Sequence, residues 1–225
     1  MKNKPSESTE RLIESLYVKK GLWDRFIQID PQDEIIRQIA DAGEPAAIPD
    51  LLPFLIIGDK RSILASEKAI HHLLQILKPA DFVRFDEFVR QGYPDWRVRR
   101  EPWYLMKPTD IGHLAGMGEM SVSLLGIASC HTNGHVREAA VRELGKTDTG
   151  TELPFLLIRA NDWVPEIRSS ARNFLLNRIR SDYIHRLMDW LPVALRLSNV
   201  GRDDHSAILD AVRRLLASSE ARGPS

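Results

Sequence analysis

The densest group of potential metal ligands in this sequence is Cys130, His131 and His135, with His113 upstream. A structural zinc site normally takes four ligands in paired short spacings, whereas Cys130 and His131 are adjacent. The sequence also lacks a nucleophile-elbow pattern, a His-Glu-x-x-His motif and a Cys-x-x-Cys motif. We therefore expect no metal, no cofactor and no catalytic residues, with Cys130 as a buried thiol at a turn between helices.

A second chemically distinctive segment, Tyr93 to Lys107, interleaves aromatic rings with guanidinium groups. Trp, Tyr and Arg dominate protein-binding hot spots, and the same residue types can stack on bases or pair with phosphates. The tryptophans could instead pack this segment against neighbouring helices while the arginines stay in solvent. The candidate binding residues in the segment are Trp96, Arg97, Arg99, Arg100, Trp103 and Tyr104.

The sequence around these two segments contains an internal repeat. His135–Leu144 aligns with Glu166–Leu175 at a shift of 31 residues, which places Ala140 on Ala171. Two further copies put Ala69 and Ala211 at the same helical position, as expected for a close contact between helices. Each copy follows an apolar stretch, so the sequence predicts a repeated helix pair. The apolar stretches are 48–57, 122–128, 152–160 and 183–195.

The breaks within these pairs carry turn-forming and helix-capping residues. Asp59, Asn133 and Asp162 lie in such breaks, and Pro165 follows near the start of a second helix, where its missing N–H costs least. No segment shows sustained period-two alternation bounded by hairpin turns, so we expect almost no sheet. Two more helices are expected before the first clear repeat, over Thr9–Ile29 and Pro31–Ala42.

These residues resemble HEAT repeats, and within them the short bacterial variety also called phycobilisome-lyase-like repeats. Gly43–Leu55 is similar to that family's opening, in which Gly and Pro precede an Ile-Pro-x-Leu first helix. Asn161–Leu175 is similar to its turn plus second helix, with Asp162 six residues before Arg168. The resemblance implies an all-α, right-handed α-α superhelix in which that Asp and Arg bond across or between adjacent repeats. The preceding copy departs from the pattern because His131 stands at the Asp position.

We accordingly expect a single α-solenoid domain over 1–225, with one degenerate or inserted unit in the middle. Its predicted parts are N-terminal capping helices (1–42), a repeat (43–78), the degenerate repeat or insertion (79–119), repeats at 120–147 and 148–181, a C-terminal repeat (182–218) and a tail (219–225).

The same resemblance implies that the second helices line a concave face where partners bind. Positions two residues past the aligned alanines, with their neighbours, form a partly basic stripe: Arg142, Arg172, Asn173, Arg213 and Arg214. Such a stripe suits an acidic protein partner or a phosphate backbone, although a solvated face is the commoner reason for surface arginines.

The amino-acid composition and the net charge exclude several classes of protein. The 225 residues are 43% hydrophobic and 28% charged, which excludes a disordered or collagen-like chain. The 31 basic residues equal the 31 acidic ones, so no global field draws the chain to nucleic acid or anionic lipid. The lone cysteine fits a reducing compartment, and no apolar stretch is long enough for a membrane span, so we expect a cytoplasmic protein.

The function that these observations favour is a non-enzymatic protein–protein interaction module: a scaffold, an adaptor, or a regulatory or immunity-type binder. Two alternatives stay open. One is a nucleic-acid-binding HEAT-like protein that uses a local Arg-rich concave patch. The other is a phycobilisome-lyase-like chaperone, implied only by the repeat subtype.

Overall fold

The computed structural model describes residues 4–17, 31–91, 101–198 and 206–220. Within these ranges every regular element is helical, which confirms the predicted all-α class. The α-helices are α1 (Glu7–Leu16), α2 (Gln32–Asp41), α3 (Ile48–Leu51), α4 (Lys60–Ile76), α5 (Phe82–Gln91), α6 (Glu101–Tyr104), α7 (Ile111–Ala115), α8 (Ser121–Ala128), α9 (Gly134–Leu144), α10 (Leu153–Arg159), α11 (Pro165–Leu176), α12 (Ile184–Ser198) and α13 (Ser206–Glu220). Short 3-10 helices are η2 (Pro45–Ala47), η3 (Leu52–Leu55), η4 (Pro79–Asp81), η6 (Pro108–Asp110), η7 (Gly118–Met120) and η8 (Ser181–Tyr183).

The predicted turn residues begin the second helices. The Asp59 carboxylate accepts a hydrogen bond from the Ser62 backbone N–H at 2.8 Å and caps α4. The Asn133 side chain accepts from the His135 N–H at 3.0 Å and caps α9. Pro165 is the first residue of α11, where a helix needs no N–H donor. The Asp59 and Asn133 side chains thus satisfy backbone N–H groups that have no partner within their helices.

Two predicted helices differ in extent. The expected helix over 48–57 is divided into α3 and η3 because Pro53 lacks the N–H that would continue an α-helical ladder. The expected helix Thr9–Ile29 corresponds to α1, which ends at Leu16, and residues 18–29 of that expected helix lie outside the described residues. At the end of α1 the Tyr17 N–H closes the last turn on the Glu14 carbonyl, and its hydroxyl donates to the Asp50 carbonyl at 2.6 Å.

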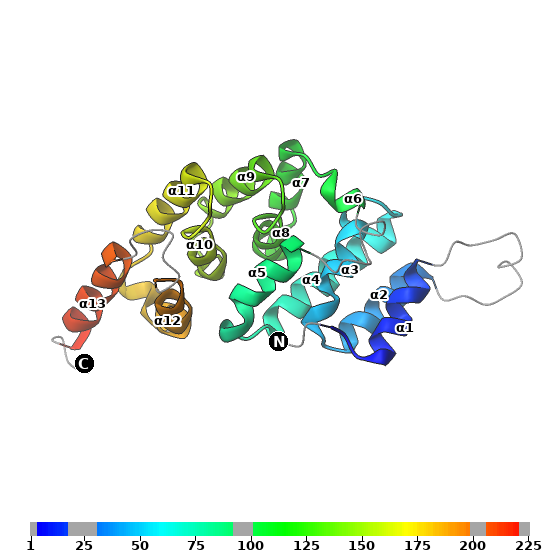
Figure 1. Cartoon of the computed structure of the whole chain (residues 1–225), viewed down its shortest axis with the longest axis horizontal. Helices are drawn as coiled ribbons and strands as arrows, with labels where there is room; N and C mark the ends of the chain where they lie inside the picture. Colours follow the sequence, from blue (N-terminus) through cyan, green and yellow to red (C-terminus); the bar gives the residue numbers. More distant parts are fainter. Residues whose placement is uncertain (1–3, 18–30, 92–100, 199–205, 221–225) are drawn as a thin grey trace, which may run out of the picture. The chain divides into compact units, whose positions relative to one another are not determined.

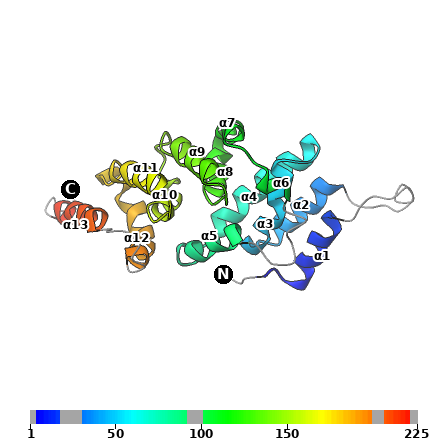
Figure 2. The ribbon, with the colours of Figure 1, turned by 45° about the horizontal axis from the view of Figure 1, so that its top comes forward.

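The described residues divide into two compact units. We call the part up to Leu77, together with Glu87–Met106, the N-terminal unit, and Lys78–Asp86 together with the part from Lys107 onward the C-terminal unit. In the N-terminal unit α1 packs on α2, α2 on α4, α3 on α4, and α6 on η3 (Figure 2). Ile36 and Ile39 of α2 and Ile70 and Leu73 of α4 are fully buried and form much of its core.

The C-terminal unit contains three helix pairs, α8 with α9, α10 with α11, and α12 with α13. The second helices also contact one another in order, α9 with α11 and α11 with α13 (Figure 1). Ala140 and Ala171, which the repeat alignment places at helix contacts, are both fully buried, as is nearly all of Ala69 in the N-terminal unit. Ala211 on α13 is partly exposed.

The first helices of two successive pairs, α8 and α10, contact each other at Gly126. The ring of Phe155 from α10 lies over the Gly126 backbone, and a Cβ at this position would overlap that ring. Gly112 in α7 offers the opposite case, because no heavy atom lies within 4 Å of the place its Cβ would take. The contact between these two first helices therefore depends on a residue without a side chain.

We expect Gly126→Ala to lower the free energy of unfolding by about 1–3 kcal/mol, because the added methyl group overpacks the contact with Phe155. The matched variant Gly112→Ala has open space and should raise stability by about 0.5–1 kcal/mol through helix propensity. Chemical denaturation of both variants measures the difference. Equal effects of the two substitutions would contradict the packing described for α8 and α10.

Candidate functional site

A groove of about 400 Å³ lies between α11 and α13 in the C-terminal unit. Its α11 wall presents residues three and four positions apart, which share one face of a helix. Leu176 on that wall is 38% exposed, while Ile208 of α13 is buried at the opposite side. The described lining consists of Pro165, Arg168, Ser169, Arg172, Asn173, Leu176 and Ile208.

The groove contains two residues of the predicted basic stripe, the partly exposed Arg172 and the exposed Asn173. The stripe's other arginines are exposed and are not part of this lining. Arg142 forms a surface ion pair with Glu138 at 2.6 Å, and Arg213 forms one with Asp210 at 3.1 Å. Exposed pairs of this kind contribute little to stability and are typical of a solvated helix face.

The aromatic segment Tyr93 to Lys107 does not present all of its predicted binding residues to solvent. Trp103 is only 1% exposed and lies in the core of the N-terminal unit, where α6 packs on η3. The prediction that Trp103 is a surface binding residue is therefore wrong, because its large apolar ring is removed from water. Tyr104 is partly exposed. The other candidates of that segment, Trp96, Arg97, Arg99 and Arg100, lie outside the described residues.

The exposed tryptophan near the groove is instead Trp163, which sequence reasoning missed. It is 62% exposed, follows Asp162 in the turn between α10 and α11, and lies two residues before the groove residue Pro165. The Arg137 guanidinium carbon lies 5.6 Å from the centroid of its ring, a cation–π distance. The available signal was its place in a predicted turn, since turns between paired helices lie at the surface.

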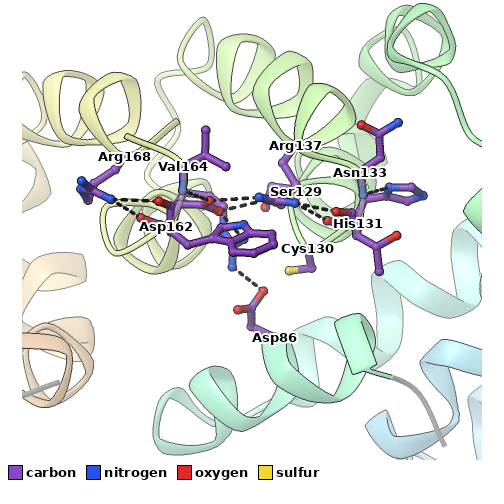
Figure 3. Close-up of polar contacts among 12 residues, drawn as sticks. Asp86, Ser129, Cys130, His131, Asn133, Arg137, Asp162, Val164 and Arg168 are labelled. Carbon is purple, nitrogen blue, oxygen red and sulfur yellow. Dashed lines mark hydrogen bonds and ion pairs between the residues drawn. The ribbon is translucent and has the colours of Figure 1, made fainter. Parts of the chain in front are cut away.

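The turn that presents Trp163 is built on the buried carboxylate of Asp162 (Figure 3). Arg137 binds it with both Nε and Nη2, at 3.0 and 3.1 Å, and Arg159 donates from Nη1 at 2.9 Å. The Val164 N–H donates to the same carboxylate at 3.0 Å. Arg159 also pairs with Asp86 at the start of the C-terminal unit. Two carboxylates thus compensate two guanidinium groups that are almost completely buried.

This arrangement connects two repeats. Arg137 and Arg168 occupy equivalent positions in the repeat alignment, 31 residues apart. Arg137 of one copy reaches the Asp162 carboxylate of the next, and Arg168 donates to the Asp162 backbone carbonyl at 2.6 Å. The Asp–Arg bonding that the resemblance implied is therefore present in this turn, with the carboxylate bonded to the preceding copy's arginine.

His131, which replaces the Asp in the preceding copy, is fully buried. Its Nδ1 accepts the Asn133 N–H at 2.9 Å, just as the Asp162 carboxylate accepts the Val164 N–H. Its backbone carbonyl accepts from Arg137 Nη1 at 3.0 Å. The imidazole keeps the turn-forming hydrogen bond that the Asp makes in the other copy, but it carries no negative charge.

Burial by itself would raise the pKa of Asp162. The hydrogen bond from Arg137 and the positive charge of Arg159 outweigh that effect and hold the pKa below its usual range. Asp162 therefore remains ionised throughout the neutral range and keeps both arginines compensated.

A second buried ion pair lies at the carboxyl ends of α9 and α11. Arg178 is 4% exposed and its Nε donates to the fully buried Glu152 at 2.5 Å. Its other nitrogens donate to the Phe174 carbonyl at 2.7 Å and to the Gly145 carbonyl at 3.1 Å. One side chain thereby satisfies carbonyl groups at the carboxyl ends of two successive second helices.

Tyr183 and Arg180 both bind Asp148 beside this pair. Burial and the bond to Asp148 raise the pKa of Tyr183 to about 12. The Tyr183 hydroxyl and Arg180 hold the pKa of Asp148 below its usual range. Tyr183 thus stays a protonated donor at neutral pH and links the start of the last repeat to the repeat before it.

The N-terminal unit has its own groove, of about 540 Å³, between α2 and α4. Its lining mixes acidic residues Asp33 and Asp41 with basic residues such as Arg61 and Lys68. Because opposite charges alternate there, this groove favours no single charge class of ligand.

Two further findings concern the part of the chain that the structure describes. It holds no group of three or more His, Cys, Asp or Glu side chains arranged to bind a metal ion. None of its helices combines the length and apolar character that a membrane span requires.

No protein-family model, curated protein or solved structure matches the chain. The resemblance to HEAT repeats therefore stays a prediction.

We expect Asp162→Asn to lower the free energy of unfolding by about 3–5 kcal/mol, because it leaves Arg137 and Arg159 with a neutral partner in a buried site. The matched control Asp182→Asn removes a carboxylate that is 75% exposed and should change stability by less than about 0.5 kcal/mol. Urea denaturation measures both. Similar losses in the two variants would contradict the role assigned to the buried carboxylate.

The same carboxylate should make stability depend on acid pH. An unfolded Asp has a pKa of about 3.9, and the folded value for Asp162 lies lower. Its stabilising contribution is therefore complete above about pH 4 and is lost as pH falls through the folded value. In denaturation series between neutral and acid pH, Asp162→Asn should show a flatter acid limb than the wild-type chain. Parallel acid limbs would refute this assignment.

Proposed function

We propose that this chain is a non-enzymatic protein-binding module, built as a right-handed HEAT-like solenoid that acts in the cytoplasm. Its contact surface is the groove between α11 and α13 together with Trp163. The observation that carries the proposal is the 62% exposure of Trp163 two residues before a groove that contains Arg168, Arg172 and the exposed side of Leu176.

The residue types support a protein partner. Tryptophan and arginine are the side chains most enriched among residues whose loss weakens protein complexes. A large ring left mostly in water gives up favourable burial in the free protein, and a partner that covers it recovers that energy. Leu176 adds aliphatic surface to the same helix face.

The underlying structure supports a preorganised surface. Asp162, next to Trp163 in the chain, is bonded to two arginines and to the Val164 N–H. Arg168 ties the start of α11 to the Asp162 carbonyl. A turn held by this many bonds loses little conformational entropy when a partner binds, which increases affinity for a given contact area.

The stacking of helix pairs supports the solenoid part of the proposal. Second helices α9, α11 and α13 contact in chain order, and Arg137 and Arg178 each bond from one copy to its neighbour. Repeat proteins use surfaces formed by successive equivalent helices to bind partners.

The test is site-specific photo-crosslinking in the native host, with p-benzoylphenylalanine at Asn173 in the groove or at Lys146, whose side chain is 70% exposed beyond α9. A protein adduct that resists nuclease should form at position 173 and not at 146. Trp163→Ala should reduce that adduct about tenfold or more, because it removes the largest exposed contact residue.

Trp163→Ala is expected to leave the unfolding midpoint nearly unchanged, because an exposed side chain contributes little to the core. Equal labelling at both positions, or labelling at 173 that is insensitive to Trp163→Ala in a folded chain, would rule out the proposed surface. A nuclease-sensitive adduct would favour nucleic acid instead.

A further inference from the structure

Helix α12 presents apolar side chains on two opposite sides. It packs on α10 and α13 and buries Val193 and Leu197. On the other side Met188 and Leu195 are each 45% exposed, with the exposed Pro192 between them. Residues three, four and seven positions apart share one face of a helix, so these three side chains form one apolar surface in water. We call Met188, Pro192 and Leu195 the α12 patch.

Two residues of opposite charge flank the α12 patch. Asp189 directly follows Met188, and Arg196 directly follows Leu195. Both charged side chains are exposed, and they lie seven residues apart, or about 10 Å along the helix axis. Within the part of the chain that the structure describes, neither of them forms an ion pair. Each charge is therefore available to a group on another molecule.

The α12 patch and its two charges are self-complementary about a two-fold axis. Met188 and Leu195 are centred within one residue of Pro192. Asp189 and Arg196 are centred within one residue of the same proline. The helical period places the apolar pair on one side of that proline and the charged pair on the other. When two copies of α12 lie antiparallel across an axis beside the proline, each Asp189 faces Arg196 of the second copy and the apolar pairs meet, so that every contact occurs twice.

We propose that two copies of this chain associate through the α12 patch, in antiparallel pairing with Asp189 of each copy against Arg196 of the other. The equal numbers of acidic and basic residues in the chain remove long-range repulsion between copies. A second copy is favoured over an unrelated partner because it necessarily presents both charges at the matching spacing. The interface is a single helix pair, so we expect reversible association. This inference is independent of the protein-binding groove, which lies between α11 and α13.

Sedimentation velocity of the full chain, at concentrations from about 1 μM to about 1 mM, measures the association. The wild-type chain should show a reversible equilibrium between monomer and dimer that weakens as the salt concentration rises. Asp189→Arg and Arg196→Asp should each weaken dimerisation about tenfold or more, because each replaces two attractive contacts by two repulsive ones. Asp189→Asn removes the attraction without adding repulsion and should weaken dimerisation less than Asp189→Arg.

Mixing the two charge-reversed variants tests the pairing itself. An equimolar mixture of Asp189→Arg and Arg196→Asp should form dimers that contain one copy of each, because every charge contact then joins opposite signs again. The control Arg142→Asp makes the same charge change at a side chain of α9 that is 66% exposed, and it should dimerise like the wild-type chain. Met188→Ser should weaken dimerisation, whereas Leu64→Ser, at a leucine that is 43% exposed in the N-terminal unit, should not.

All of these side chains are exposed, so the variants should keep the circular dichroism spectrum and the unfolding midpoint of the wild-type chain. A wild-type chain that stays monomeric up to about 1 mM would overturn the proposal. A dimer that is insensitive to both charge reversals would also overturn it, because that dimer would use another surface. A mixture of the two reversed variants that stays monomeric, or a different protein that binds the α12 patch of a monomeric chain, would have the same consequence.

Discussion

The carboxylate of Asp162 is the interaction on which the C-terminal unit depends. It compensates two buried guanidinium groups, one from the preceding copy and one from its own copy, and also accepts the Val164 N–H at the start of α11. A buried ion pair need not add net stability compared with an apolar core. It does demand a specific geometry, because a displaced carboxylate would leave two arginines in a site from which water is excluded. The same carboxylate is bonded to the Val164 N–H, so this geometry includes the turn in which Trp163 is exposed and from which α11 begins.

The helices could be predicted from the sequence because their signals are local. Apolar periodicity, capping residues such as Asp59 and Asn133, and a small residue at one repeat position all act within a few turns of helix. Ala140 and Ala171, which the alignment pairs, are both completely buried. The first helix, α1, ends at Leu16, and the Tyr17 hydroxyl that follows it binds the carbonyl of Asp50, 33 residues away, a contact that no local pattern indicates.

The candidate site was predictable only in part, because its exposure and its long-range contacts are not encoded by local sequence signals. Two residues that the repeat alignment singled out, Arg172 and Asn173, lie in the groove between α11 and α13. Local composition does not reveal which tryptophan is exposed: Trp103 lies in an aromatic, Arg-rich segment and is buried, whereas Trp163 stands in a polar turn and faces solvent. The pairing of Arg159 with Asp86 joins residues 73 positions apart, and no spacing in the sequence indicates it.

His131 makes the aligned copies 120–147 and 148–181 chemically different at the turn between their two helices. A duplicated copy of the unit 148–181 would bring its own Asp at the turn, and that carboxylate would meet Arg168 of the copy before it, as Asp162 now meets Arg137. A duplicated copy of 120–147 would instead present a neutral imidazole to the arginine of the preceding copy and leave a buried cation uncompensated. Duplication of 148–181 would thus keep the buried arginine of the preceding copy compensated, whereas duplication of 120–147 would not.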